Sequence, residues 1–310
     1  MSMDAQPIRN PSLPAAYLRL LATSLMPRQK PGITEDAALP GPIEARLAAD
    51  PARASRYREV CGIAEDVSPL LWPQVLGLPL HMALLSDRRL PGSVLGMVHL
   101  AQRVTWRGAL PVNHPLDFRV SLVHAGQHRR GPVLAMRTRV QAGERYWHGE
   151  SLILFRAGPG RERPESTEEG RQIRPPAISG FETARSETIE CPPGTTWDYA
   201  RVSGDYNPIH LGQWPARLLG QHSVLSHGLW TLARCFSTAN IHADRPSAGK
   251  LEAWFTAPLP CPGSARLALD SSGYRLRLEE EKRSRVLLQA EIQPAESEEA
   301  QPVAAGEAAE

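Results

Sequence analysis

The chain has 310 residues, a length that exceeds one average domain and suits two. Its 35 basic residues nearly balance 33 acidic ones, and the formal net charge is +2. No basic run is interleaved with aromatic residues, so nucleic-acid binding is not expected. The hydrophobic fraction of 42% is sufficient for a real core.

The cysteines and the N-terminal sequence indicate the cellular compartment. The chain has widely spaced cysteines without a Cys-x-x-Cys pair, which indicates buried thiols rather than a zinc site or a disulfide framework. The apolar run at 13–26 contains Pro14 and Arg19 and is too short to span a bilayer. No basic segment directly precedes it, as one would in a signal peptide. We therefore expect a cytoplasmic protein without a membrane partner.

Residues 1–54 are expected to form an N-terminal extension. Apolar residues at 17, 18, 21 and 25 share one helical face and predict a short amphipathic helix at 13–25. The prolines between 27 and 42 then predict an extended connector.

Residues 55–157 form the first expected globular unit. A strand is predicted at 57–63, and the apolar run 76–85 predicts a short buried helix that begins after Pro79. Turn signals such as the Arg-Gly pair at 107–108 separate the strand-like stretches that follow. These strands are predicted at 97–106, 117–124, 133–140 and 146–155.

A linker is predicted at 158–185, which is rich in Pro, Gly, Glu and Arg and lacks apolar periodicity. The second unit, 186–293, repeats the order of strand, helix and antiparallel strands. Its helices are predicted at 196–203 (with Thr195 or Thr196 as N-cap), 214–219 and 227–239, and its strands at 187–191, 251–256, 265–269, 274–278 and 286–292. Residues 294–310 are expected to be a disordered acidic tail.

The chemistry of the chain is concentrated at 203–210, Ser-Gly-Asp-Tyr-Asn-Pro-Ile-His. The glycine can end a helix, and the proline keeps the preceding Asn207 out of the α region. Asp205 and His210 are therefore expected on a tight loop that turns both side chains toward one point. A carboxylate and an imidazole so placed can hold and deprotonate a water molecule. Taken alone, however, Asp-x-Asn-Pro is also common turn chemistry.

Residues 203–210 resemble the hydratase motif of the MaoC-like dehydratase family, which includes (R)-specific enoyl-CoA hydratases and 3-hydroxyacyl-thioester dehydratases. The similarity covers about 196–263. It includes the family's short helix at 216–220 (Ala-Arg-Leu-Leu-Gly), its entry to the central helix at 226–230 (Ser-His-Gly-Leu-Trp), and a strand and turn at 254–258 and 262–263. The first unit is more weakly similar to the degenerate half of two-domain members, chiefly at 78–82.

This resemblance implies an α+β double hotdog, in which each unit is an antiparallel β-sheet wrapped around a long central helix. The degenerate hotdog would occupy 55–157 and the catalytic MaoC-like hotdog 186–293. The first unit has no Asp-x-Asn-Pro-x-His sequence, so one active site per chain is expected. Because a double hotdog pairs its own two sheets, the chain could be a monomer, as a pseudo-dimer, or a homodimer.

The resemblance and the chemistry together imply reversible hydration of 2-enoyl thioesters to (R)-3-hydroxyacyl thioesters, a lyase activity of fatty acid metabolism. Asp205 and His210 would share water activation, Asn207 would orient the loop or His210, and Gly228 would donate its N–H to the thioester oxygen. Substrate contacts are expected from Ser203, Gly204, Tyr206, His227 and Leu229. The substrate would be an acyl-CoA or acyl carrier protein thioester, and no metal or other cofactor is implied.

Two other functions remain open. A hotdog acyl-CoA thioesterase would release free thiol, and a non-catalytic acyl-thioester-binding protein would bind ligand without turnover. The segment 221–225 is more polar than is usual in the family, with Gln221 where Phe often stands, which leaves room for the second of these. Several other histidines are expected to be structural or exposed: His81, His99, His124 and His148.

Overall fold

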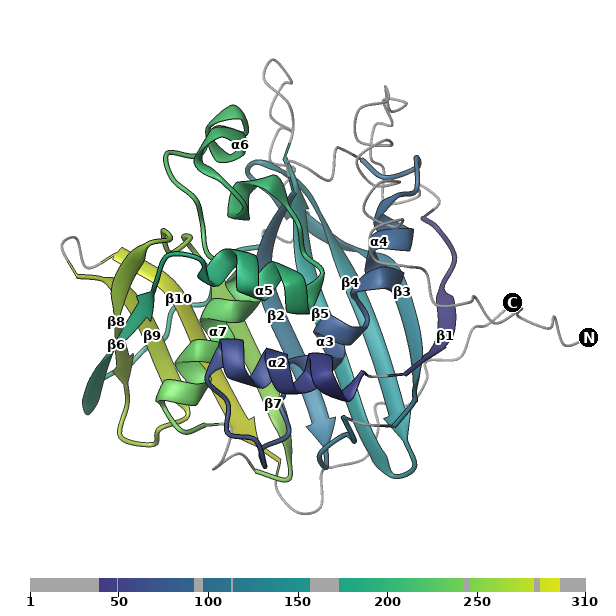
Figure 1. Ribbon diagram of the computed structural model, residues 1–310, viewed down its shortest axis with the longest axis horizontal. Helices are drawn as coiled ribbons and strands as arrows, with labels where there is room; N and C mark the ends of the chain where they lie inside the picture. The colour runs from purple at the N-terminus through teal and green to yellow at the C-terminus, as the bar shows by residue number, and fades with distance from the viewer. Residues whose placement is uncertain are drawn as a thin grey trace, which may run out of the picture.

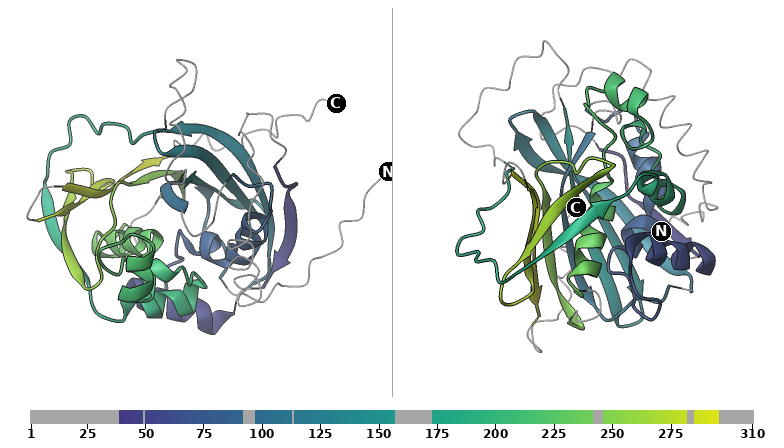
Figure 2. Two further views of the ribbon diagram at one scale, coloured as in Figure 1. Left: turned by 90° about the horizontal axis from the view of Figure 1, so that it is seen from above. Right: turned by 60° about the vertical axis from the view of Figure 1, so that its left-hand side comes forward.

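The computed structural model describes residues 39–48, 50–91, 97–112, 114–156, 173–241, 246–281 and 285–295. Its central feature is a ten-stranded antiparallel sheet in the order β1-β3-β4-β5-β2-β7-β10-β9-β8-β6 (Figure 1). The sheet curls around the helices, which lie on its inner side (Figure 2). The helix predicted at 13–25, and most of the linker and the acidic tail, lie outside the described residues.

The first half of the sheet precedes the linker. Its strands are β1 (Ile43–Leu47), β2 (Met97–Arg107), β3 (Leu116–His128), β4 (Gly131–Ala142) and β5 (Arg145–Phe155), and its helices are α2 (Pro51–Cys61), α3 (Trp72–Leu76) and α4 (Leu78–Leu85). The structure confirms the four strands predicted from residue 97 onward and the short buried helix. Residues 43–47 were expected in the N-terminal extension outside the sheet and instead form β1, which pairs with β3 at the sheet edge.

The strand predicted at 57–63 is wrong, because most of these residues belong to α2. Asp50 caps the helix by accepting the Ala52 N–H at 2.9 Å, and a proline occupies the first turn. Tyr57 and Cys61, four residues apart, are both fully buried on one helical face. Gly62, at φ 68°, then ends the helix in the left-handed conformation. These capping signals decide the structure over the strand-like composition of 57–63.

The second half follows the linker. Its strands are β6 (Arg185–Cys191), β7 (Ala248–Phe255), β8 (Gly263–Leu269), β9 (Arg275–Glu280) and β10 (Arg285–Pro294), and its helices are α5 (Thr195–Ser203), the 3-10 helix η2 (Pro208–His210), α6 (Gln213–Leu218) and α7 (Gly228–Thr238). The strands and helices predicted here are confirmed. The N-cap of α5 is Gly194 rather than a threonine, because this position has φ 91°, which glycine adopts without steric cost.

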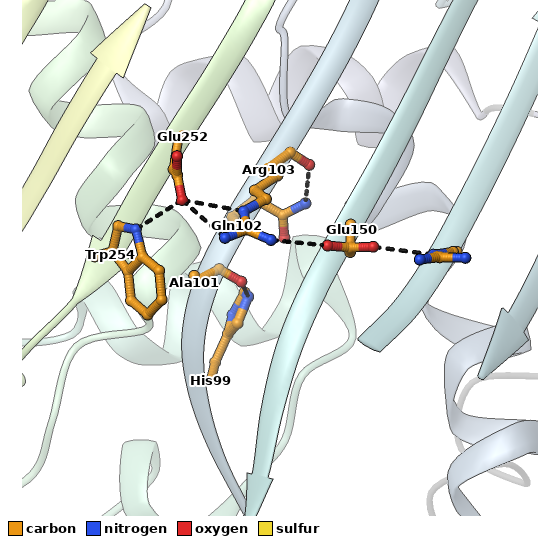
Figure 3. A network of polar contacts seen from close by, with 8 residues as sticks. His99, Ala101, Gln102, Arg103, Glu150, Glu252 and Trp254 are labelled. Atoms are coloured by element: carbon orange, nitrogen blue, oxygen red, sulfur yellow. Dashed lines mark hydrogen bonds and ion pairs between the residues drawn. The ribbon is translucent and has the colours of Figure 1, made fainter. Parts of the chain in front are cut away.

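The two halves join where β2 pairs with β7, from Ala101 opposite Trp254 to Arg107 opposite Ala248. At this junction Arg103 donates hydrogen bonds to Glu150 at 3.1 Å and to Glu252 at 3.0 Å (Figure 3). The three side chains are partly exposed, so each ion pair contributes about 1 kcal/mol or less. Arg103 and Glu252 are direct cross-strand partners at the junction, so their opposite charges favour the observed register.

The expected α+β double-hotdog fold is confirmed by this sheet and its helices. In the first half, however, the helical layer is divided between α3 and α4 instead of one long central helix. The cysteines are buried free thiols, and burial raises the pKa of Cys235 to about 12. Within the described ranges, no helix has the length and apolar character needed to cross a membrane.

Candidate active site

Helix α5 leads the chain into the motif. Gly204, at φ 83° and ψ 7°, ends the helix as predicted, and its N–H donates to the Ala200 carbonyl at 2.8 Å. The next N–H, of Asp205, donates to the Ser203 hydroxyl at 3.1 Å. The turn is therefore fixed by its own backbone and side chains before Asp205 is reached.

The loop between Asp205 and His210 is built from two successive Asx-type turns. The Asp205 carboxylate accepts the Asn207 N–H at 3.1 Å, and the Asn207 side chain accepts the Ile209 N–H at 3.4 Å. Asn207 has ψ 125°, as expected for a residue before proline, and Pro208 begins η2. The predicted tight loop is confirmed, and Asn207 lies within it as an organising residue.

The tautomer of His210 is set by the backbone. Its Nδ1 lies 2.7 Å from the Leu225 carbonyl, which can only accept, so Nδ1 carries the proton and Nε2 has the lone pair. His210 is buried, and this burial lowers its pKa, while the Asp205 charge and the Leu225 hydrogen bond act in the opposite direction. His210 is therefore a neutral imidazole that can accept a proton.

His227, the N-cap residue of α7, packs directly against His210. The two rings stack with centroids 3.8 Å apart, and the Tyr199 ring lies 4.8 Å from His227. The His227 Nε2–H donates to the Asp205 carbonyl at 3.0 Å. Its Nδ1 is buried and has no hydrogen-bond partner among the described residues. Burial lowers the pKa of His227 to about 3, so this ring is also neutral.

Asp205, His210 and His227 each offer an atom within 4.8 Å of the other two. A carboxylate and two imidazoles are also the donor types that transition metals accept. The two rings lie face to face, however, and the proton chemistry of a carboxylate and a neutral imidazole needs no ion. The arrangement can place two proton acceptors around one small volume.

Gly228 follows His227 as the first residue of α7, where backbone N–H groups have no partner within the helix. A Cβ atom at Gly228 would lie 3.2 Å from the Phe255 ring, so the aromatic ring closely covers this helix start. A glycine here permits that approach. The N–H of Gly228 and the positive end of the helix dipole provide a place for an oxygen that gains negative charge.

The first half of the chain places His99 of β2 beside the site. A bulge in the β2–β5 pairing between His99 and Ala101 places His99 on the same face as Gln102, whose side chain accepts from buried Ser151 at 2.8 Å. The centroid of the His99 ring lies 4.8 Å from that of Phe255. The His99 Nε2 forms a hydrogen bond with the Ala101 carbonyl at 3.0 Å (Figure 3). Burial lowers its pKa to about 4, and the Asp205 charge opposes this shift.

The remaining residues expected to contact substrate lie around this cluster. Ser203 is buried, and its hydroxyl is engaged by the Asp205 N–H. Tyr206 and Leu229 are partly buried and pack against the main hydrophobic core. Sequence reasoning placed His99 among the structural or exposed histidines, and it included Phe255 in the strand at 254–258 without giving it a role in the site. No local signal marks either residue, because their position depends on the β2 bulge and on the pairing of two distant strands.

Comparisons with known proteins show which sequences and folds this chain resembles. Residues 174–284 match the family model described as MaoC like domain, which includes the whole loop and α7. The chain is 29% identical over 225 residues to "3-hydroxyacyl-thioester dehydratase X" of Mycobacterium tuberculosis strain ATCC 25618 / H37Rv, covering 71% of this chain and 76% of the relative.

Solved structures show the same architecture. A crystal structure of HtdX of Mycobacterium tuberculosis has a TM-score of 0.68 and 25% identity, covering 82% of this chain and 100% of that one. A MaoC-like dehydratase from Phytophthora capsici, 17% identical, covers 87% of this chain and 100% of that one with a TM-score of 0.68, which shows the shared fold. The resemblance seen in the motif is confirmed over residues 174–284, which match the MaoC like domain.

Proposed function

We propose that the chain is a hydro-lyase that reversibly converts (R)-3-hydroxyacyl thioesters into 2-enoyl thioesters and water. The observation that carries the proposal is the convergence of Asp205 and His210 beside the start of α7. A relative named as a 3-hydroxyacyl-thioester dehydratase supports the same reaction class. The acyl group would be carried by coenzyme A or an acyl carrier protein.

In the hydration direction, Asp205 and His210 hold one water between them as hydrogen-bond acceptors. The base removes a proton while the water oxygen forms a bond to Cβ, and the electrons of the double bond move toward the thioester carbonyl. The group that took up this proton then returns it to Cα. The atoms of one water are thus added across the double bond, and dehydration follows the same steps in reverse.

The negative charge that develops on the thioester oxygen needs a donor in the transition state. Gly228 supplies its backbone N–H at the first position of α7, where the helix dipole adds partial positive charge. Phe255 lies over this position, His99 packs against the Phe255 ring, and together they would limit access of bulk water. The first half of the chain, which lacks the motif, therefore completes the wall of a site carried by the second half.

The proposal is tested by adding the protein to short 2-enoyl-CoA substrates and following loss of the conjugated thioester absorbance. Asp205→Asn and His210→Ala are each expected to lower turnover by about a hundredfold or more, the usual contribution of a general acid or base. His114→Ala, in an exposed position between β2 and β3, is the control and should keep wild-type turnover. Both site variants at wild-type rates would refute the assignment.

The two alternative functions, thioesterase and non-catalytic binding protein, would give different results when the protein is mixed with acyl-CoA thioesters. Release of free thiol from acyl-CoA would indicate a thioesterase. Saturable binding without turnover over a panel of chain lengths would indicate an acyl-thioester-binding protein. Chiral analysis of the 3-hydroxyacyl product tests the expected (R) configuration, and the same panel defines the preferred acyl length.

A further inference from the structure

Arg53 of α2 binds the end of α5 across about 150 residues of sequence. Its Nε donates to the Val202 carbonyl at 2.7 Å, and its Nη2 donates to the Ser203 carbonyl at 3.0 Å. The guanidinium also lies over the Trp72 ring, 5.6 Å from its centroid. Arg53 is therefore held on one side by an aromatic ring and on the other by two backbone oxygens.

The two carbonyls are among the last four of α5, which have no partner within the helix. A cation at a helix C-terminus also interacts favourably with the helix dipole. The guanidinium offers donors in a fixed planar fork, so one side chain satisfies both oxygens at once. The α2 and α5 helices lie side by side, which brings Arg53 to this point (Figure 1).

The residues held by Arg53 directly precede the catalytic loop. Ser203 is followed by Gly204 and then by Asp205, whose N–H returns to the Ser203 hydroxyl. On its other side the Asp205 backbone is held by the His227 ring. Arg53 thus fixes one end of the peptide segment that carries Asp205, and His227 fixes the other.

We propose that Arg53 is a positioning residue that sets the place of the Asp205 loop from the opposite half of the chain. This inference rests on the proposed hydratase function of the loop. It gives the N-terminal part of the fold a direct effect on turnover, through two hydrogen bonds rather than through contact with substrate. The activity of the second half then depends on correct docking of α2.

Three substitutions separate positioning from packing. Arg53→Met keeps an unbranched stem beside Trp72 but removes both donors. Arg53→Lys keeps the charge but loses the planar fork. Arg53→Ala leaves room for free guanidinium. The control is Arg56→Ala, which removes an exposed arginine from the same helix.

Kinetics with a short 2-enoyl-CoA are the first measurement. Displacement of a catalytic group lowers the rate of the chemical step more than it weakens substrate binding. Arg53→Met is therefore expected to lose about tenfold to a hundredfold in kcat, with KM changed by less than about threefold. Arg53→Lys should fall between Arg53→Met and wild type. Guanidinium below denaturing concentrations should raise the kcat of Arg53→Ala and not that of Arg53→Met. Arg53→Met and Arg53→Ala with wild-type kcat would overturn the proposal.

Hydrogen–deuterium exchange of peptides that cover 204–210 is the second measurement and does not depend on activity. Exchange in this segment should be severalfold faster in Arg53→Met than in Arg56→Ala, with both variants folded. If wild type shows no turnover, the proposed function fails, and the exchange comparison still decides whether Arg53 holds the loop. Equal exchange in the two variants would refute the positioning role in either case.

Discussion

The imidazole rings of His210 and His227 stack with their centroids 3.8 Å apart and an angle of 29° between their planes. The same His227 donates to the Asp205 carbonyl at 3.0 Å. One side chain therefore contacts both members of the proposed catalytic pair, the ring of one and the backbone of the other. This arrangement assigns His227 an orienting role and leads to the first prediction.

Two substitutions of His227 should separate the effect of its hydrogen bond to Asp205 from the effect of its stacking on His210. His227→Phe keeps an aromatic ring against His210 but loses the hydrogen bond, which is worth about 1 kcal/mol or roughly fivefold in rate. His227→Ala also removes the stacking partner, so its kcat should be lower than that of His227→Phe. Steady-state turnover of a short 2-enoyl-CoA measures both. Equal activity of His227→Ala and wild type would contradict the orienting role.

The protonation of His210 should respond to Asp205. Burial lowers the His210 pKa below its ordinary value, and the Asp205 charge partly opposes this shift. In Asp205→Asn the opposing charge is absent, so the His210 pKa should fall further. The imidazole C–H resonances of His210, followed by NMR against pH, measure this directly even in an inactive variant. A titration that moves to higher pH in Asp205→Asn would contradict the electrostatic assignment.

In the wild type, the lowered pKa of His210 predicts the pH below which activity is lost. Hydration requires neutral His210, so kcat/KM should fall with acid only below about pH 6.5, the ordinary histidine pKa. A limb well above that value would mean that another group controls the reaction.

The conformation of the loop from Gly204 to His210 was predictable because it is set locally. Gly204 ends α5, Pro208 restricts Asn207, and both effects act within a few residues of Asp205. The start of α7 at Gly228 was predictable for the same reason, since the apolar periodicity of 227–239 is strong. These elements place the groups of the site without knowledge of the first half.

The contribution of the first half was not predictable in the same way. The sequence at 57–63 is compatible with a strand, and only the Asp50-Pro51 cap and Gly62 show that it belongs to α2. Because α2 is not predicted from the sequence, no position in the fold can be assigned to Arg53. His99 likewise reaches the site only because a bulge turns it inward and because β2 pairs with β7. Contacts between residues 150 positions apart leave no periodic signal in the sequence.

A buried histidine far from the loop should make stability depend on pH. His81 on α4 is 3% exposed and bonds Thr138 at 2.8 Å, and burial lowers its pKa to about 3. Its folded pKa is below the unfolded value of about 6.5, so the unfolded state binds the proton first as pH falls. As far as His81 is concerned, the free energy of unfolding should therefore be greatest above about pH 6.5 and should decrease as the pH falls toward 3.

His81→Gln removes this titration while retaining a polar side chain that can bond Thr138. Between pH 6 and pH 4, wild type should lose about 1.4 kcal/mol of unfolding free energy per pH unit more than the variant. Urea denaturation at several pH values gives both curves. Because His99 and His227 remain in the variant, some acid destabilisation should persist. Parallel curves for the two proteins would show that His81 takes up no proton on unfolding.

The contact between Gly228 and Phe255 gives the last prediction. In Gly228→Ala the new methyl group would lie 3.2 Å from the Phe255 ring, so the ring or the start of α7 must shift by a few tenths of an ångström. Overpacking of this kind costs about 1–3 kcal/mol of stability, and the shift also moves the N–H proposed for the thioester oxygen. We expect a lower kcat and a lower melting temperature.

Adding Phe255→Leu to Gly228→Ala should relieve the contact and recover part of both losses, with Phe255→Leu alone as the reference. Gly41→Ala is the matched glycine control, because a Cβ atom there meets nothing within 4 Å. If the double variant is no better than Gly228→Ala, the steric contact is not the cause. A double-mutant cycle on kcat and on the free energy of unfolding measures the coupling between the two positions. In both quantities the double variant should lose less than the sum of the losses of the two single variants.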